Sequence, residues 1–478
     1  MESLNIINPS TAIFLTLFIC LIFIFIGVSY SKKFLGLNNY LVANRTIGTF
    51  SLTTSLVASA LGAWVLFGPS SAATWGGIGA VIGYALGTAF PLFILIYLGQ
   101  KFRNQYPKGK SLIEVIRLNF GDNLFKLILF LSIFYMTIFL IAEVTAVSIL
   151  INYISGTDLW ITALIVITSS LIYTLYGGLR ASIFTDNIQF IVFFLLLIIG
   201  FYYLISLNSL NFNFEFINNS KPYLLSSKYI PNYTAGLTFF IAVAATNLFH
   251  QGNWQRVYAA KNIKVLKRSL LLSFIIIIPI VFMMGFTGLI AISENSNILP
   301  DLAFFSLLLK QNSLLLSIII IFLAISLTVS SIDTLINAIS SLIIVDGNKI
   351  MNFKGDYSKL SKQIILLISF ITLIVASKGL SILYLFLLAD LLCCSAVLSI
   401  FYGFYIKSLN GKKIFLSIIS GLICGLILFP TPDFSKSILI GIIFPIDYFP
   451  DFISSSLLFI SFMTATIIPV FLWKIKIK

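Results

Sequence analysis

Residues 321–341 read IFLAISLTVSSIDTLINAISS, a mostly apolar run with a polar cluster at its centre. The run is long enough to cross the hydrocarbon core of a bilayer as one helix. Residues three and four positions apart share one face of a helix, and here that face holds Ser330, Asp333, Thr334 and Asn337. Polar side chains are costly inside a bilayer, and clustered hydroxyl and carboxylate oxygens suit a small alkali cation. The alternative is that the hydroxyls only bond to carbonyls of their own helix.

The composition is that of an integral membrane protein. Hydrophobic residues make up 59% of the 478-residue chain and charged residues 10%, far from the balance of a soluble domain. Because a backbone in lipid must satisfy its own hydrogen bonds, and the apolar runs are continuous, we expect an all-α fold. About thirteen transmembrane helices are predicted, near residues 10–30, 49–68, 75–98, 124–152, 158–176, 184–206, 231–249, 266–293, 312–345, 361–377, 379–405, 412–429 and 452–473.

Lysine and arginine are distributed unequally between the two sides of these helices. With the N-terminus outside, the outer loops hold five of the 30 basic residues, which are Lys221, Lys228, Lys310, Lys378 and Lys436. Inner loops carry the excess of positive charge in membrane proteins, so this distribution indicates an N-terminus outside and a C-terminus in the cytoplasm. We expect a multi-pass protein of a cell membrane, in a bacterium.

Several other classes of function are disfavoured. The net charge of +14 requires no nucleic acid, because inner loops that face anionic lipid explain it. The four cysteines fall in apolar runs and the chain has one histidine, so neither a metal cluster nor a cofactor is expected. The motifs H-E-x-x-H and G-x-S-x-G are missing, which argues against an enzyme. The predicted partners are lipid, a small-molecule solute and an ion, with no obligate protein partner.

Two further features of the sequence are predicted to lie near the middle of the membrane. Acidic residues fall within or at the edge of predicted helices at Glu143, Asp186, Asp333 and Asp390. No lysine or arginine is predicted at a similar depth, so these carboxylates would be protonated, hydrogen-bonded or paired with a mobile cation. The second and seventh apolar runs both contain small residues at mid-length. Such paired weak helices indicate an inverted-repeat transporter, although small residues also permit close helix packing.

Three stretches resemble signature sequences of the sodium:solute symporter family: YTLYGGLRASIFTDNIQ at 173–189, HQGNWQRVYAAKN at 250–262 and VSSIDTLINAISS at 329–341. A fourth, SALGAWVLFGP at 59–69, is similar to the sodium/proline members. The resemblance implies an all-α LeuT-type fold with a 5+5 inverted repeat. Carried onto this sequence, the parts would be an extra helix at 10–30, a first repeat at 49–206, a second at 231–405 and two C-terminal helices at 412–473.

The resemblance also implies where ions and solute bind. A sodium site would use backbone carbonyls and two hydroxyls, from Ala58, Leu61, Leu327, Ser330 and Ser331. A possible second ion site would use Asp186, Asp333 and Thr334, where the carboxylate of Asp333 replaces a hydroxyl and could bind a proton instead. The solute pocket would be lined by Ala60, Gly62, Ala63, Trp64, Glu143, Thr246, Asn247 and Phe249. We interpret Asp390 as a structural partner outside the site, His250 as a polar helix end and Arg256 as a residue that faces the inner water.

These residues predict a secondary active transporter that carries a small organic solute together with sodium by alternating access. The small residues around Trp64 favour a compact solute, such as proline or a related amino acid. Three alternatives stay open. They are coupling to protons, another solute such as urea, a sugar or a vitamin, and a transporter-like membrane sensor.

Overall fold

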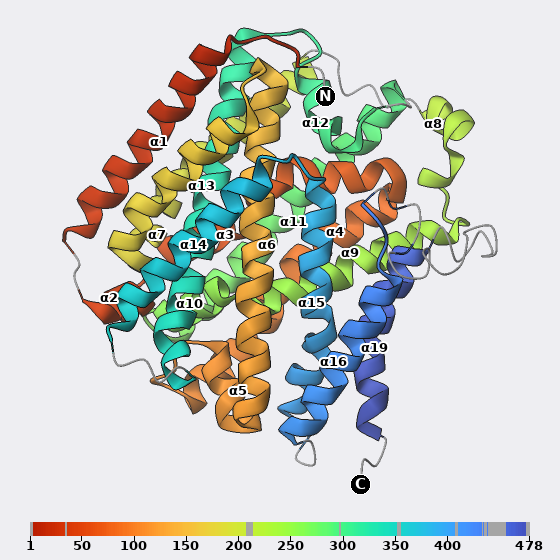
Figure 1. Ribbon diagram of the computed structural model, residues 1–478. Coiled ribbons are helices and arrows are strands. Elements are labelled where there is room, and N and C mark those ends of the chain that lie inside the picture. Colours follow the sequence, from red (N-terminus) through yellow and green to blue (C-terminus); the bar gives the residue numbers. More distant parts are fainter. Residues whose placement is uncertain are drawn as a thin grey trace.

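Helices dominate the part of the chain that the computed structural model describes, which comprises residues 3–33, 36–206, 214–295, 298–350, 355–406, 410–432, 434, 437 and 456–474. The helices are α1 (Pro9–Ser31), α2 (Leu37–Val42), α3 (Thr49–Ala60), α4 (Trp64–Gln105), α5 (Leu112–Phe120), α6 (Asp122–Ser155), α7 (Leu159–Ser206), α8 (Phe214–Ser220), α9 (Ile230–Phe249), α10 (Gln251–Ala259), α11 (Ile263–Glu294), α12 (Ala303–Leu308), α13 (Leu314–Val345), α14 (Tyr357–Ala376), α15 (Ile382–Gly403), α16 (Gly411–Leu428) and α19 (Leu457–Lys474) (Figure 1). Short 3-10 helices lie at Ala43–Arg45, Pro222–Leu224, Pro300–Leu302 and Gly347–Lys349.

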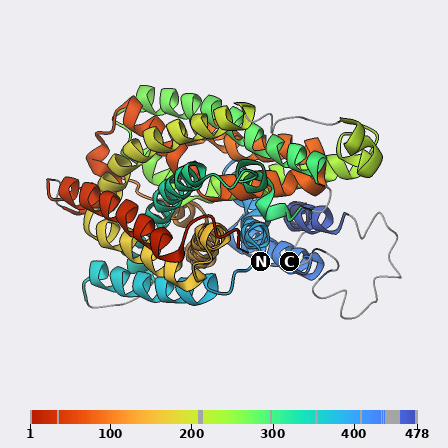
Figure 2. The ribbon, with the colours of Figure 1, turned by 90° about the horizontal axis from the view of Figure 1, so that it is seen from above.

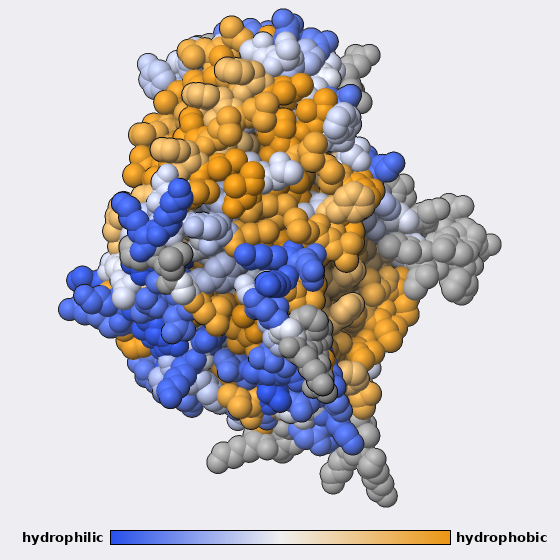
Figure 3. Space-filling model, turned by 60° about the vertical axis from the view of Figure 1, so that its left-hand side comes forward, coloured by the Kyte–Doolittle hydropathy of each residue, from blue (hydrophilic) through white to orange (hydrophobic). Residues whose placement is uncertain are grey.

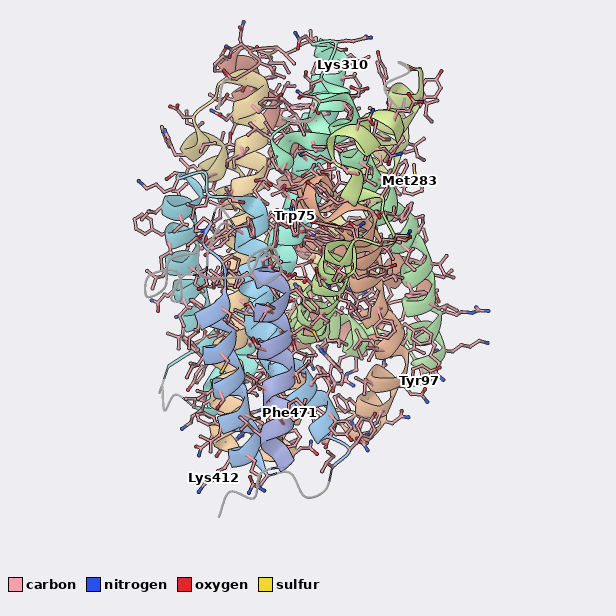
Figure 4. All side chains as sticks on the ribbon, turned by 90° about the vertical axis from the view of Figure 1, so that its right-hand side faces the viewer. Trp75, Tyr97, Met283, Lys310, Lys412 and Phe471 are labelled. Atoms are coloured by element: carbon pink, nitrogen blue, oxygen red, sulfur yellow. The ribbon has the colours of Figure 1, made fainter. Side chains whose placement is uncertain are left out.

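The surface confirms a membrane protein. Within the described residues, nine helices are long and apolar enough to cross a bilayer. Large apolar side chains such as Tyr97 and Phe471 are exposed on the flanks, whereas Lys310 and Lys412 lie at opposite ends of the molecule (Figure 4). Figure 3 shows a broad hydrophobic surface with hydrophilic residues gathered toward its lower end. Exposed apolar surface on this scale requires a partner, which for these helices is lipid.

Two helices are each longer than one crossing. α4 has 42 residues and α7 has 48, so each would extend well beyond a bilayer if it were straight. Both contain one residue that leaves the helical region, Gly77 in α4 and Gly178 in α7, each with φ 59°. Side chains are disfavoured at such positive φ, so glycine suits both positions. The bend at Gly178 separates the predicted crossings 158–176 and 184–206, whereas the bend at Gly77 lies just inside the predicted crossing 75–98.

α5 and α10 are two short helices of nine residues each. The helix predicted at 231–249 is α9, but the second short helix, α10, which follows it after one residue, is not predicted. A helix of nine residues, α5, begins at the capping residue Ser111, whose Oγ accepts a hydrogen bond from the backbone N–H of Glu114 at 3.0 Å. α10 proves central to the site, because it carries charge into the protein interior.

The core that positions the site is built around α13. This helix packs against α6, α7, α10 and α14, and in the view from above it lies inside the ring formed by other helices (Figure 2). α4 packs closely on α9, where Gly79 and Gly83 face the backbone of Asn232 and Gly236. Small residues allow such close approach between membrane helices. α3 and α10 also contact α13, so both broken helices lie beside it.

Candidate functional site

The first break in the helices lies between α3 and α4, at residues 61–63. Leu61 has φ −106° and ψ 87°, outside the helical region. Glycine is required at position 62, because a Cβ there would collide with the carboxylate of Glu143 and would lie 2.5 Å from Ser331 Oγ. The break therefore lies directly against α6 and α13.

The second break lies between α9 and α10, at His250. Its backbone leaves the helical region with ψ 109°, and its Nδ1 accepts a hydrogen bond from the backbone N–H of Gly252 at 3.1 Å. The side chains of Asn253 and Trp254 donate to carbonyl oxygens near the end of α9, at 2.9 and 2.8 Å. These contacts satisfy backbone groups that a helix end leaves without partners. The interpretation of His250 as a polar helix end is confirmed.

The residues predicted for a sodium site lie at the end of α3, in the break and in the middle of α13. The fully buried ones are Ala58, Leu61, Leu327 and Ser330. Ser330 Oγ donates to Asp186 Oδ1 at 2.7 Å. Ser331 is 6% exposed, and its Oγ has no hydrogen-bond partner among the described residues. Because an unpartnered buried hydroxyl is costly, Ser331 is suited to receive a ligand.

A buried ion pair joins α7 to α10. Arg256 and Asp186 are both fully buried, with 2.8 Å between Nη2 and Oδ2. Arg256 Nε donates to Ser55 Oγ at 2.7 Å, and Nη2 also donates to Thr334 Oγ1 at 3.0 Å. The prediction that Arg256 faces the inner water is therefore wrong, as is the prediction that no arginine reaches the depth of the buried carboxylates. The physical reason is that all nine residues of α10 are buried within the protein after the break at His250.

Asp333 has a different environment from Asp186. Its carboxylate accepts hydrogen bonds from Tyr173, Ser182 and Thr185 of α7, at 2.8, 2.9 and 3.2 Å. The three residues predicted for a second ion site, Asp186, Asp333 and Thr334, thus belong to one buried network. The guanidinium of Arg256 occupies part of that network. Two of the three predicted ligands already contact a fixed cation, so the second ion site stays a prediction.

A small cavity of about 50 Å³ lies between the two breaks and α13, α6 and α15. The described residues that line it are Ser59, Ala60, Trp64, Tyr84, Phe139, Glu143, Val243, Thr246, Asn247, His250, Ser331, Leu335, Phe386 and Asp390.

Most of the predicted pocket residues lie at this cavity. The structure places Ala60, Trp64, Glu143, Thr246 and Asn247 in its wall. Gly62 and Ala63 contact Glu143 from behind the wall. Phe249 is not among the lining residues and packs on Phe401, with 5.4 Å between ring centroids.

Asp390 is the main residue that sequence reasoning misplaced. It lines the cavity rather than lying outside the site, and its Oδ1 accepts a hydrogen bond from Thr246 Oγ1 at 2.6 Å. On the opposite side, Glu143 Oε2 accepts a hydrogen bond from the backbone N–H of Ala63 at 2.8 Å. Both side chains are almost fully buried. The only signal in the sequence was an acidic residue inside an apolar run, a feature that marks functional positions in membranes.

Comparison with known proteins decides the family. The model of the family described as "Sodium:solute symporter family" matches residues 40–421. The chain belongs to this family. It is therefore a transporter rather than an enzyme, as the sequence predicts.

Curated relatives cover different shares of the chain. "Spermidine transporter DUR31" from Candida albicans is 27% identical over 389 residues, which is 79% of this chain and 71% of that protein. "High-affinity proline transporter PutP" from Bacillus subtilis is 30% identical over 187 residues, 36% of this chain and 38% of that protein. "Sodium/glucose cotransporter 1" from Ovis aries is 28% identical over 165 residues, 33% of this chain and 24% of that protein.

Solved structures confirm the LeuT-type fold. A substrate-bound, outward-open Na⁺-coupled sialic acid symporter superposes with a TM-score of 0.70 at 17% identity, covering 96% of this chain and 98% of the other. Mhp1, a nucleobase-cation-symport-1 family transporter, superposes with a TM-score of 0.59 at 13% identity, covering 92% and 95%. At these identities the likeness concerns the fold alone.

Proposed function

We propose that this protein is a sodium-coupled symporter that carries a small organic solute across a cell membrane by alternating access. The observation that carries the proposal is the position of Ser331. Its unpartnered hydroxyl faces the α3–α4 break from α13 and also lines the cavity. An ion bound beside it would therefore adjoin the solute, which is what coupling requires.

The proposed ion ligands belong to two separate parts of the bundle. The carbonyls come from Ala58, Leu61 and Leu327, and the hydroxyls from Ser330 and Ser331. A sodium ion among them would favour the state in which the α3–α4 break and α13 are together, because it binds that state better than the separated one. Entry of the ion along the membrane potential adds about 2.3 kcal/mol per charge per 100 mV.

The remaining sequence predictions form part of the same proposal. The N-terminus would lie outside and the C-terminus in the cytoplasm of a bacterial cell. The two inverted repeats would cover 49–206 and 231–405, with 10–30 before them and 412–473 after them. α1 begins near the upper end of Figure 1 and α19 ends near the lower end, which supports termini on opposite sides.

The relatives are named for different solutes, so their names narrow the class of solute without identifying the solute of this chain. One is named for spermidine, one for proline and one for glucose. The relative that matches the largest share of this chain among these three is the one named for an amine. This favours a nitrogen-containing solute over a sugar, and it leaves both the predicted amino acid and a simple amine in place.

Proton coupling is the second candidate. It is supported by the surroundings of Asp333, which consist of hydroxyl donors, whereas the buried guanidinium bonds directly to Asp186. A carboxyl group in such surroundings could exchange a proton instead of holding sodium. Asp333 would then carry the coupling charge.

Uptake into proteoliposomes tests the proposal. The vesicles would hold the purified full chain, with the membrane potential fixed and a panel of amines, amino acids and sugars offered outside. We expect at least one solute to accumulate with an inward sodium gradient and to stop accumulating when choline replaces sodium. Accumulation that follows a pH gradient equally well in sodium and in choline would support the proton alternative and contradict sodium coupling.

A further inference from the structure

The N-terminus of α4 faces the break, and a carboxylate of the protein already lies on it. In a broken membrane helix, the positive end of the second half is where a negatively charged group of a solute can bind. Here the N–H of Ala63 donates to Glu143 Oε2 at 2.8 Å. Further along the first turn, the N–H groups of Val65 and Leu66 donate to the carbonyls of Gly62 and Ala63. Glu143 thus occupies the position that a solute's carboxylate would take.

Gly62 is adapted to this arrangement. Any Cβ at position 62 would collide with Glu143 Oε1, so the glycine provides the space that the carboxylate fills. A second carboxylate brought to the same place by a solute would meet a like charge in a buried site, which strongly disfavours both being ionised. The break therefore selects against solutes that carry an acid group.

A second carboxylate faces the cavity from α15. Asp390 is 4% exposed and is held by Thr246. Among the described lining residues there is no lysine or arginine, and His250 accepts a hydrogen bond through Nδ1, as a neutral imidazole does. This contrasts with Asp186, which has the fixed cation Arg256. Buried carboxylates without a fixed cation favour a mobile one.

Two further features of the wall suit an organic cation. Trp64 and Tyr84 stack with 5.5 Å between ring centroids, and both line the cavity. Aromatic faces attract ammonium groups through their π electrons. The unpartnered hydroxyl of Ser331, on the same wall, offers an acceptor beside the carboxylate of Glu143.

We propose that the cavity binds an organic amine without a carboxylate, whose ammonium group or groups pair with Glu143 and Asp390. Glu143 supplies the acid group that an amino acid would otherwise bring. This rests on the proposed function, because it assigns the solute class of the same transport site. It replaces the amino acid favoured by the sequence with its decarboxylated counterpart.

Matched pairs of solutes test this inference. Pyrrolidine and proline differ by one carboxylate, as do 1,4-diaminobutane and ornithine. Thermal unfolding of the purified full chain would be measured in sodium chloride with each compound. We expect at least one amine to raise the melting temperature and the amino acid of its pair to leave it unchanged, since a ligand that binds only the native state stabilises it. Equal or greater stabilisation by the amino acids, or stabilisation by neither amine, would overturn the inference.

Variants that neutralise one carboxylate at a time test whether Glu143 and Asp390 bind the amine. Glu143→Gln and Asp390→Asn should each weaken the apparent affinity for the amine about tenfold to a hundredfold, the usual loss when a charged hydrogen-bond partner is removed. Glu294→Gln removes a carboxylate that pairs with Lys310 away from the cavity and should leave the affinity unchanged. Unaltered amine affinity in both cavity variants would overturn the inference. If Glu143→Gln does not fold, Asp390→Asn and the wild-type comparison decide.

Thermal unfolding also separates this inference from the proposed function. Stabilisation by sodium chloride relative to choline chloride, with no solute, reports the ion site alone. If sodium stabilises the protein but the amino acids bind better than the amines, the inference on solute class fails and the proposed function stands. If sodium has no effect while the amines bind, sodium coupling fails and the solute class stands.

Discussion

The buried pair of Arg256 and Asp186 makes a quantitative prediction about stability. Both side chains are fully buried, 2.8 Å apart, and further hydrogen bonds come from Ser55, Ser330 and Thr334. Removing one partner leaves an uncompensated charge away from water. Asp186→Asn or Arg256→Gln should each lower the free energy of unfolding by about 3–5 kcal/mol. The double variant leaves neither charge, so it should lose clearly less than the sum of the two single losses.

Denaturant titration of the four proteins in detergent micelles measures this coupling. We expect the sum of the two single losses to exceed the loss of the double variant by about 0.5–3 kcal/mol, the range of directly interacting pairs. Arg117 and Asp122 serve as the control, because they form an ion pair at the surface, where water screens it. The corresponding variants there should show no measurable coupling. Additive losses at Arg256 and Asp186 would refute the reasoning that the pair stabilises the bundle as a unit.

Three further changes test other parts of the account. Arg256→Met, if it folds, removes the fixed cation at Asp186. The melting temperature of this variant should therefore rise more steeply with sodium concentration than that of the wild type. An unchanged dependence on sodium concentration would argue against a second ion site there. Gly62→Ala places a Cβ against Glu143 and Ser331, so it should abolish binding in the cavity and destabilise the protein by about 1–3 kcal/mol; unchanged binding by calorimetry would contradict this packing. Gly79→Ala should cost a similar amount in thermal unfolding because it meets the backbone of Asn232, while Gly200→Ala meets nothing within 4 Å and should not destabilise; equal effects would contradict the close approach of α4 and α9.

The sequence predicts the helices well where they are apolar and poorly where they are not. The runs at 10–30 and 312–345 agree closely with α1 and α13, because length and hydrophobicity alone identify a membrane helix. α10 was missed because its sequence, QGNWQRVYA, resembles a polar inner loop. Only its packing against α13 shows that this segment is buried and that Arg256 points into the core.

The residues of the candidate site also divide into those that the sequence indicates and those that it does not. Glu143 stands out in the sequence as an acidic residue inside an apolar run, and Trp64 follows from the family resemblance, which implies a solute pocket at the second run. The position of Asp390 at the cavity could not be predicted, because an acidic residue in an otherwise apolar helix does not show which face of that helix meets a cavity. The hydrogen bond between Glu143 and the N–H of Ala63 joins residues 80 positions apart. Spacing along the chain cannot reveal a contact of that kind, and the proposed preference for an amine over an amino acid rests on this contact.

Direct binding of radioactive sodium to the purified protein tests the central claim most simply, because it needs no knowledge of the solute. Wild-type protein should bind ²²Na⁺ saturably, and Ser331→Ala should lose most of that binding. Ser317→Ala, which removes a buried hydroxyl that bonds to Ser313 O within α13 at 3.0 Å, should bind like the wild type. Equal sodium binding by the wild type and both variants would contradict an ion site between the α3–α4 break and α13.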